Sequence, residues 1–211
     1  CQWAIQPSVS LNATPTELVY SDDDLQNLVA QIDGHFEDLW KCQELTPAQP
    51  ADELLLMRRL ALSLMGTVPS LEEIRQFKLD NQPDRIERWT QRYLDDPRFA
   101  DYFAERLARC FVGVDGGQFI VFRRDRFVSW LSDQLEANEP YSQIVRQMIS
   151  SNGLWTGEPQ TNFITAAVAN KDLDENKLAS RSVRAFLGQS MDCAQCHDHP
   201  FNENWQQKHF E

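Results

Sequence analysis

The chain has 211 residues, of which 42% are apolar and 25% charged, and its formal net charge is −12. This length and apolar content allow one substantial core, so we expect one domain with an appended terminal segment. The acidic balance argues against non-specific binding to nucleic acids or anionic membranes, because both need a positively charged surface. No apolar run approaches the ~20 residues of a membrane-spanning helix, so any membrane attachment would have to be chemical.

The N-terminus starts with Cys1 rather than methionine. Bacterial lipoproteins start in this way, because their signal peptide is removed directly before a cysteine that carries a diacylglycerol group. Residues 2–16 are polar and aperiodic and contain proline, as a tether would. We therefore expect residues 1–20 to be a lipoprotein tether that attaches a periplasmic or cell-surface protein, through Cys1, to the outer membrane. A boundary that falls at a cysteine by chance is the alternative.

Hydrophobic periodicity predicts an all-α domain over residues 21–211, with no convincing sheet. Apolar residues recur at spacings of three and four over residues 25–40, 54–65, 84–94, 97–112, 119–137 and 141–149. The acidic residues 22–24 suit the start of the first helix, and Gly66 suits the end of the second. Ser70 and Glu73 form a capping box that opens a further helix through Leu79.

The region from residue 151 to 174 has a different composition, rich in glycine, proline and asparagine. It predicts a long irregular segment, and loops of such length are often functional or shaped around a ligand. A helix over residues 175–190 then leads to a cysteine motif. The predicted fold is therefore an irregular multi-helix domain with a long loop before a C-terminal motif.

This motif is Cys193-Ala194-Gln195-Cys196-His197. Two cysteines separated by two residues can form thioethers with the two vinyl groups of one haem, and the next histidine can bind the iron. With five cysteines and four histidines in the chain, chance gives only about 0.002 such matches. We expect one covalent haem c, with His197 as its proximal ligand.

Two other uses of the motif remain open. Cys193, Cys196, His197 and His199 offer two sulfurs and two nitrogens suited to tetrahedral zinc, although four ligands within seven residues would be unusually compact. A redox pair of thiols is the other use, but no preceding strand or βαβ pattern accompanies the cysteines.

The sequence offers several candidates for the distal haem ligand. Met191 and His199 lie so near the motif that they would hardly reach the opposite haem face. The remaining candidates are His35, His209, Met57, Met65 and Met148. His209 is favoured because its side chain could reach the distal haem face and imidazole is a common iron ligand. Methionines in apolar helices usually fill a core.

Three residues are candidates for contacts around the haem. His199 could orient the haem edge or bind a propionate. Arg181 and Arg184 could bind propionates, because guanidinium groups suit carboxylates and the helix that carries them leads into the motif. Solvated arginines and a turn histidine without a task are the alternatives.

Two of the five cysteines have no role in the lipid anchor or the motif. With Cys1 lipidated and the motif cysteines bound to haem, Cys42 and Cys110 remain, and in an oxidising compartment they could form a disulfide. Two separate buried thiols are the alternative.

Several segments, in order, resemble the planctomycete-type cytochrome c-associated domain, an exported bacterial domain of unknown function. The matching segments are residues 56–60, 66–73, 93–100, 127–131, 138–146 and 185–201. The last one, which continues from the motif through Asp198-His199-Pro200-Phe201, is the most specific. The resemblance covers residues 22–211 and implies an exported helical domain, often accompanied by a separate cytochrome c domain. Family members extend far beyond this motif, and such an extension could supply the distal ligand.

These observations predict a lipid-anchored electron-transfer subunit that exchanges electrons with a redox protein or a larger exported or membrane complex. The acidic charge would help to select that partner. The alternatives are a haem enzyme with an open distal face, with residues 151–174 as a pocket wall, and a structural subunit in which the motif holds zinc or a disulfide. No catalytic residue is predicted.

Overall fold

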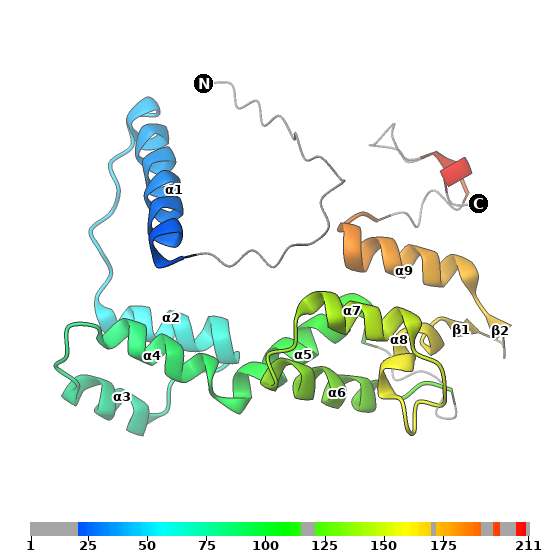
Figure 1. Cartoon of the computed structure of the whole chain (residues 1–211). Coiled ribbons are helices and arrows are strands. Elements are labelled where there is room, and N and C mark those ends of the chain that lie inside the picture. Colours follow the sequence, from blue (N-terminus) through cyan, green and yellow to red (C-terminus); the bar gives the residue numbers. More distant parts are fainter. Residues whose placement is uncertain (1–20, 115–120, 170–171, 191–195, 199–205, 210–211) are drawn as a thin grey trace. The chain divides into compact units, whose positions relative to one another are not determined.

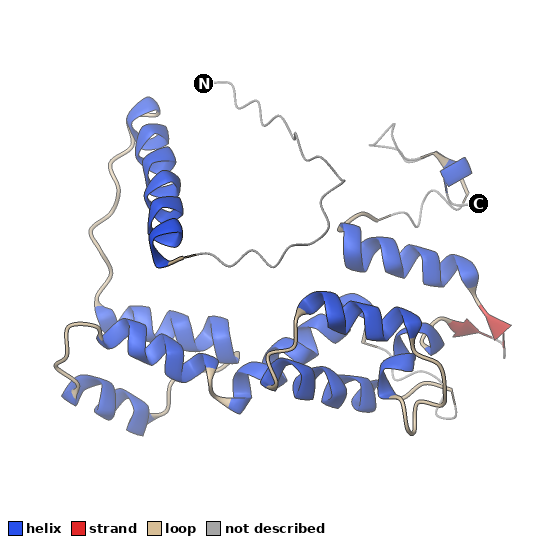
Figure 2. Cartoon of the chain, in the orientation of Figure 1, coloured by secondary structure: helices blue, strands red, loops and turns tan. Residues whose placement is uncertain are grey.

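The computed structural model describes residues 21–114, 121–169, 172–190, 196–198 and 206–209. These residues are predominantly helical, and the fold is all-α as predicted (Figures 1 and 2). The chain divides into two compact units, Cys1–Ala51 and Asp52–Glu211, which are described separately. The predicted tether, residues 1–20, lies outside the described residues.

Among its described residues, from Ser21 onwards, the first unit contains one helix, α1 (Asp22–Cys42). Its start is a capping box: the Ser21 hydroxyl accepts the N–H of Asp24, and the Asp24 carboxylate accepts the N–H of Ser21. The three acidic residues of its first turn also favour the positive end of the helix dipole. The prediction of a helix that begins at this acidic triplet is confirmed.

The second unit opens with α2 (Glu53–Met65), α3 (Leu71–Leu79) and α4 (Arg85–Leu94). Gly66 ends α2 in the left-handed conformation, at φ 68°, and the predicted Ser70–Glu73 capping box starts α3. The three helices contribute the first core, which consists of Met57, Ala61, Met65, Phe77, Trp89 and Tyr93.

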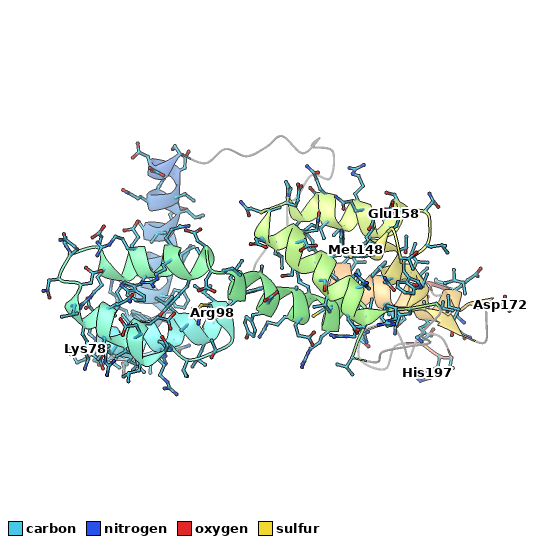
Figure 3. All side chains as sticks on the ribbon, turned by 90° about the horizontal axis from the view of Figure 1, so that it is seen from below. Lys78, Arg98, Met148, Glu158, Asp172 and His197 are labelled. Atoms are coloured by element: carbon cyan, nitrogen blue, oxygen red, sulfur yellow. The ribbon has the colours of Figure 1, made fainter. Side chains whose placement is uncertain are left out.

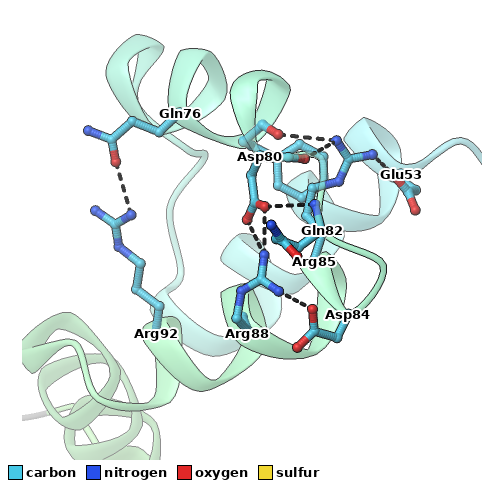
Figure 4. A network of polar contacts seen from close by, with 9 residues as sticks. Glu53, Gln76, Asp80, Gln82, Asp84, Arg85, Arg88 and Arg92 are labelled. Atoms are coloured by element: carbon cyan, nitrogen blue, oxygen red, sulfur yellow. Dashed lines mark hydrogen bonds and ion pairs between the residues drawn. The ribbon is translucent and has the colours of Figure 1, made fainter.

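Arginines of α4 secure the turn between α3 and α4 (Figure 4). Arg88 pairs with the carboxylates of Asp80 and Asp84, and its hydrogen bond holds the pKa of Asp80 below the usual value. Arg85 donates to the carbonyls of Phe77 and Asp80, at 3.2 and 2.8 Å, and also pairs with Glu53 of α2. Because Asp80 is the C-cap of α3, Arg85 satisfies a carbonyl that the helix itself leaves without a partner.

A larger second core forms around α5 (Pro97–Phe111), α6 (Arg124–Glu136), α7 (Tyr141–Ser150) and α8 (Asn162–Thr165). Small alanines at positions 100, 104 and 108 form a buried stripe on α5, and such a stripe allows neighbouring helices to approach closely. The members of the second core are Ala104, Ala108, Phe111, Val112, Phe122, Phe127, Trp130, Leu131, Ile144, Met148, Phe163 and Ala166.

Helix α6 begins later than the periodicity suggests. A helix over residues 119–137 was expected, but Arg123 is extended, with φ −132°, and α6 starts at Arg124. The backbone N–H of Arg123 donates to Oδ1 of the fully buried Asn162 at 2.8 Å. This contact spans 39 residues, so hydrophobic periodicity along α6 could not reveal it.

The irregular segment predicted for residues 151–174 is partly ordered and partly buried. It contains a 3₁₀ turn (Pro159–Thr161), α8, and a two-residue antiparallel pair, β1 (Val168–Ala169) with β2 (Asp172–Leu173). Apart from this two-residue pair, the described residues contain no strand, as the all-α prediction expects. Because Asn162, Phe163 and Ala167 are buried, this part of the segment belongs to the protein interior rather than to a free loop.

Candidate functional site

Helix α9 (Glu175–Leu187) carries the chain from the hairpin towards the cysteine motif. Its N-cap is Asp174, whose carboxylate accepts the N–H of Lys177 at 2.9 Å. Phe186 fastens the other end, with its ring centroid 5.9 Å from Phe111 and 5.5 Å from Phe163. Helix α9 therefore packs on the second core through Phe186, a residue that lies shortly before the motif in the sequence.

The helix does not continue into the motif. It ends at Leu187, because Gly188 adopts a left-handed conformation with φ 64°. The expected end at Ser190 was thus three residues too late. Cys193 lies outside the described residues, so the structure does not test its predicted place beside Cys196.

Cys196 and His197 are the described part of the motif, and both are exposed (Figure 3 labels His197). Cys196 carries a free thiol. The His197 Nδ1 lies 2.7 Å from the backbone oxygen of Asp198. A carbonyl can only accept, so in a hydrogen bond between these atoms Nδ1 is the donor, and in the neutral form of that tautomer Nε2 has the lone pair.

Asp198 also makes a contact with the C-terminal end of the chain. Its Oδ1 accepts the backbone N–H of Gln207 at 2.9 Å. Gln207 opens a short 3₁₀ turn, Gln207–His209. The carboxylate therefore connects the motif to a turn nine residues further along, a contact that sequence reasoning missed. An aspartate before a short turn is a weak local signal, and no periodic pattern marks it.

The described groups are compatible with the predicted haem. A c-type haem needs a reactive thiol and an imidazole with a free nitrogen, and histidine ligands of metals usually donate their other N–H to a carbonyl or carboxylate. Cys196 is a free, exposed thiol, and the His197 Nδ1 lies within hydrogen-bond distance of a carbonyl oxygen. No group of three or more metal-binding side chains occurs among the described residues, and the zinc alternative depends on Cys193 and His199, which lie outside them.

The candidates for a distal ligand have different surroundings. Met57 and Met65 belong to the first core and Met148 to the second, each at most 5% exposed, so the three methionines are core residues (Figure 3 labels Met148). His35 is an exposed residue of α1. The backbone of His209 lies in the turn that Asp198 holds, so His209 stays the leading prediction.

The predicted propionate partners are both on α9. Arg184 is exposed and Arg181 is half-buried. Because α9 ends at Leu187, the helix does not extend from these arginines to Cys196 and His197. His199 lies outside the described residues, and the roles of these three residues stay predictions.

The predicted disulfide between Cys42 and Cys110 is absent, because Cys110 is a free, exposed thiol. The pairing was inferred by elimination alone, and elimination does not show which thiols bond. The alternative of two buried thiols is wrong for Cys110 as well, since it is exposed.

A cavity of about 410 Å³ lies at the junction of α4 and α5 and the end of α6. Its lining includes Leu94, Phe99 and Leu135 together with the carboxylates of Asp95 and Glu136. The cavity is thus separate in sequence from the motif. Within the part of the chain that the structure describes, no helix combines the length and apolar character needed to cross a bilayer.

Comparison with known families identifies one match. The model of PSCyt2, a protein family of unknown function (DUF1549), matches residues 31–211. Neither the curated proteins nor the solved structures contain a significant match. The match runs through both cores, α9 and the motif, and on this basis the chain belongs to the PSCyt2 family.

Proposed function

We propose that this protein is an exported c-type haem protein that transfers electrons within a larger complex. The observation that supports it most is the His197 geometry, in which Nδ1 lies 2.7 Å from the Asp198 carbonyl oxygen, a contact that suits the Nδ1–H tautomer. In that tautomer the neutral imidazole offers Nε2 to iron. The free thiol of Cys196 lies next to it in the chain.

Attachment would use the two cysteines of the motif. Each thiol would add its sulfur and its hydrogen across one vinyl group of the haem, giving a thioether with no group lost. The haem would supply a one-electron couple, whose potential depends on its axial ligands and surroundings. The exposure of Cys196 and His197 suits both the attachment and a haem edge within reach of a partner.

Electron transfer is a better match than catalysis for this chain. The segment that could have formed a substrate pocket places Asn162, Phe163 and Ala167 in the protein interior instead. A formal charge of −12 would direct the protein to a redox partner with a basic surface, by an attraction that salt screens. The proposed location is the periplasm or the cell surface.

The test is a pyridine haemochrome spectrum of protein produced with a haem-attachment system. We expect a c-type spectrum for the native chain, and a shifted or lost band for Cys196→Ala, which removes one thioether. Cys110→Ala is the matched control, because it removes another exposed free thiol outside the motif. Its spectrum should be unchanged.

A colourless native protein would refute the proposal, and stoichiometric zinc in that protein would then establish the metal alternative. With haem attached, the spin state separates the two haem functions. A six-coordinate low-spin haem supports electron transfer, whereas a five-coordinate high-spin haem would favour a reactive open face.

A further inference from the structure

Asp198 contacts His197, which precedes it in the chain, and Gln207, which follows it. Its backbone oxygen lies 2.7 Å from the His197 Nδ1, and its carboxylate accepts the Gln207 N–H at 2.9 Å. The first contact is made by the main chain and the second by the side chain. A single residue therefore joins the orientation of the imidazole to the C-terminal turn.

We propose that Asp198 is a positioning residue that holds His197 in the Nδ1–H tautomer by fixing its own backbone through the bond to Gln207. The two contacts act in series. The carbonyl of Asp198 faces the imidazole only in a restricted range of backbone angles, and an exposed residue without a tertiary bond would sample many others. The charge-assisted bond from Gln207 restricts that freedom.

The two Asp198 contacts are present without haem. Their use in preparing His197 for iron rests on the proposed function. A neutral imidazole can carry its proton on either nitrogen, and only the Nδ1–H form offers Nε2 to a metal. Holding that tautomer before the iron arrives removes an unfavourable step from ligation. Second partners of this kind commonly orient metal-binding histidines.

The same contact has a consequence for the end of the chain. Gln207 begins the Gln207–His209 turn, so the bond to Asp198 keeps the backbone of His209 close to the motif. Loss of the carboxylate should release this turn together with the imidazole. The tautomer and the turn should therefore respond to the same substitution.

The experiment is long-range ¹H–¹⁵N NMR of the imidazoles in the full chain without haem, at alkaline pH where histidine is neutral. In the native chain we expect the His197 Nε2 resonance in the unprotonated range and Nδ1 in the protonated range. Asp198→Ala should move both resonances towards the averaged positions of an unconstrained histidine. His35, in α1, is an internal control whose resonances should not move.

Two variants separate positioning from general damage. Asp198→Asn keeps an oxygen that can accept the Gln207 N–H, so it should retain the native tautomer. Asp172→Ala removes another exposed aspartate upstream of α9 and should leave His197 unchanged. If Asp198→Ala misfolds, the asparagine variant decides, because a folded Asp198→Asn protein that has lost the native tautomer contradicts the positioning role.

The inference is overturned if native His197 carries its proton on Nε2, or if Asp198→Ala leaves both resonances in place. It is supported if the alanine variant shifts them and the asparagine variant does not. These outcomes do not depend on haem. A colourless protein with the expected tautomer would refute the proposed function alone, whereas a haem-containing protein with a freely averaging His197 before attachment would refute the positioning role alone.

Discussion

The two cores of the second unit are stabilised in different ways. The first core has six buried residues, and ion pairs and caps at its edge secure the turns between its helices. The second core is twice as large and mostly aromatic and aliphatic, and it is the one on which α9 packs. A small core buries little apolar surface, so the ion pairs and helix caps beside it contribute a larger share of its stability. Because α9 packs on the second core, the position of the helix that leads to the motif depends on that core.

Replacing one buried phenylalanine in each core should have the largest effect. Phe163→Ala in the second core and Phe77→Ala in the first each remove a ring that is 1% exposed, at a cost of about 3–5 kcal/mol. Of these two phenylalanines, Phe163 contacts Phe186 of α9 and Phe77 has no such contact. Urea unfolding should show similar losses, whereas the haem content per protein should fall further in Phe163→Ala. Equal haem loss in both variants would contradict the separation of roles.

Arg98→Ala should weaken the edge of the first core by about 2 kcal/mol, because it leaves a nearly buried carboxylate without its cation. Arg98 donates to Glu73 and to Asp96, both at 2.7 Å, and Glu73 is only 8% exposed. Chemical denaturation measures the loss. Arg98→Lys should recover only part of it, because lysine cannot reproduce the bidentate contact with Asp96.

The same group gives a pH dependence. Burial raises the pKa of Glu73, but hydrogen bonds from Arg98 and Ser70 outweigh it, so the pKa lies below its ordinary value of 4.5. A carboxyl group with a lowered folded-state pKa stabilises fully above the unfolded-state value and loses this contribution as the pH falls through the folded-state value. The native protein should therefore lose stability below about pH 4.5, and Glu73→Gln should lose less over the same range.

Gly66→Ala should cost about 1–2 kcal/mol from the left-handed backbone alone, and more because the added Cβ would overlap the Tyr102 ring. Thermal denaturation would show a lower midpoint. Gly157→Ala is the control, since its Cβ would meet no atom within 4 Å. If both variants had the same midpoint, the close approach of Tyr102 to the end of α2 would be wrong.

The smallest effect is expected at the exposed pair of Arg75 with Glu72. Its atoms are 3.9 Å apart and both side chains are 65% exposed, so solvent screens the interaction. Arg75→Ala should change the unfolding free energy by less than about 0.5 kcal/mol. A loss comparable to that of Arg98→Ala would mean that surface charge, rather than the nearly buried Glu73, secures the first core.

The sequence predictions were correct where a feature depends on contacts within a few residues, and wrong where it depends on contacts between distant residues. The start of α3 at Ser70 and the end of α2 at Gly66 were predicted correctly, because each cap is a contact within a few residues. The start of α6 was wrong because Asn162, far along the chain, binds the backbone of Arg123. The Cys42–Cys110 pairing was wrong because a count of cysteines does not determine which thiols bond, and Cys110 is free.

The sequence by itself determined the helices, most of their ends, and the spacing of the cysteines and histidine in the motif. These features depend on hydrophobic periodicity, on side chains that cap a nearby backbone group, and on residue order. Only the tertiary structure decided that the candidate methionines fill the cores, that Phe186 anchors α9, and that Asp198 joins His197 to Gln207. Each of these depends on how separate parts of the chain pack or bond in space, and no local pattern in the sequence encodes that.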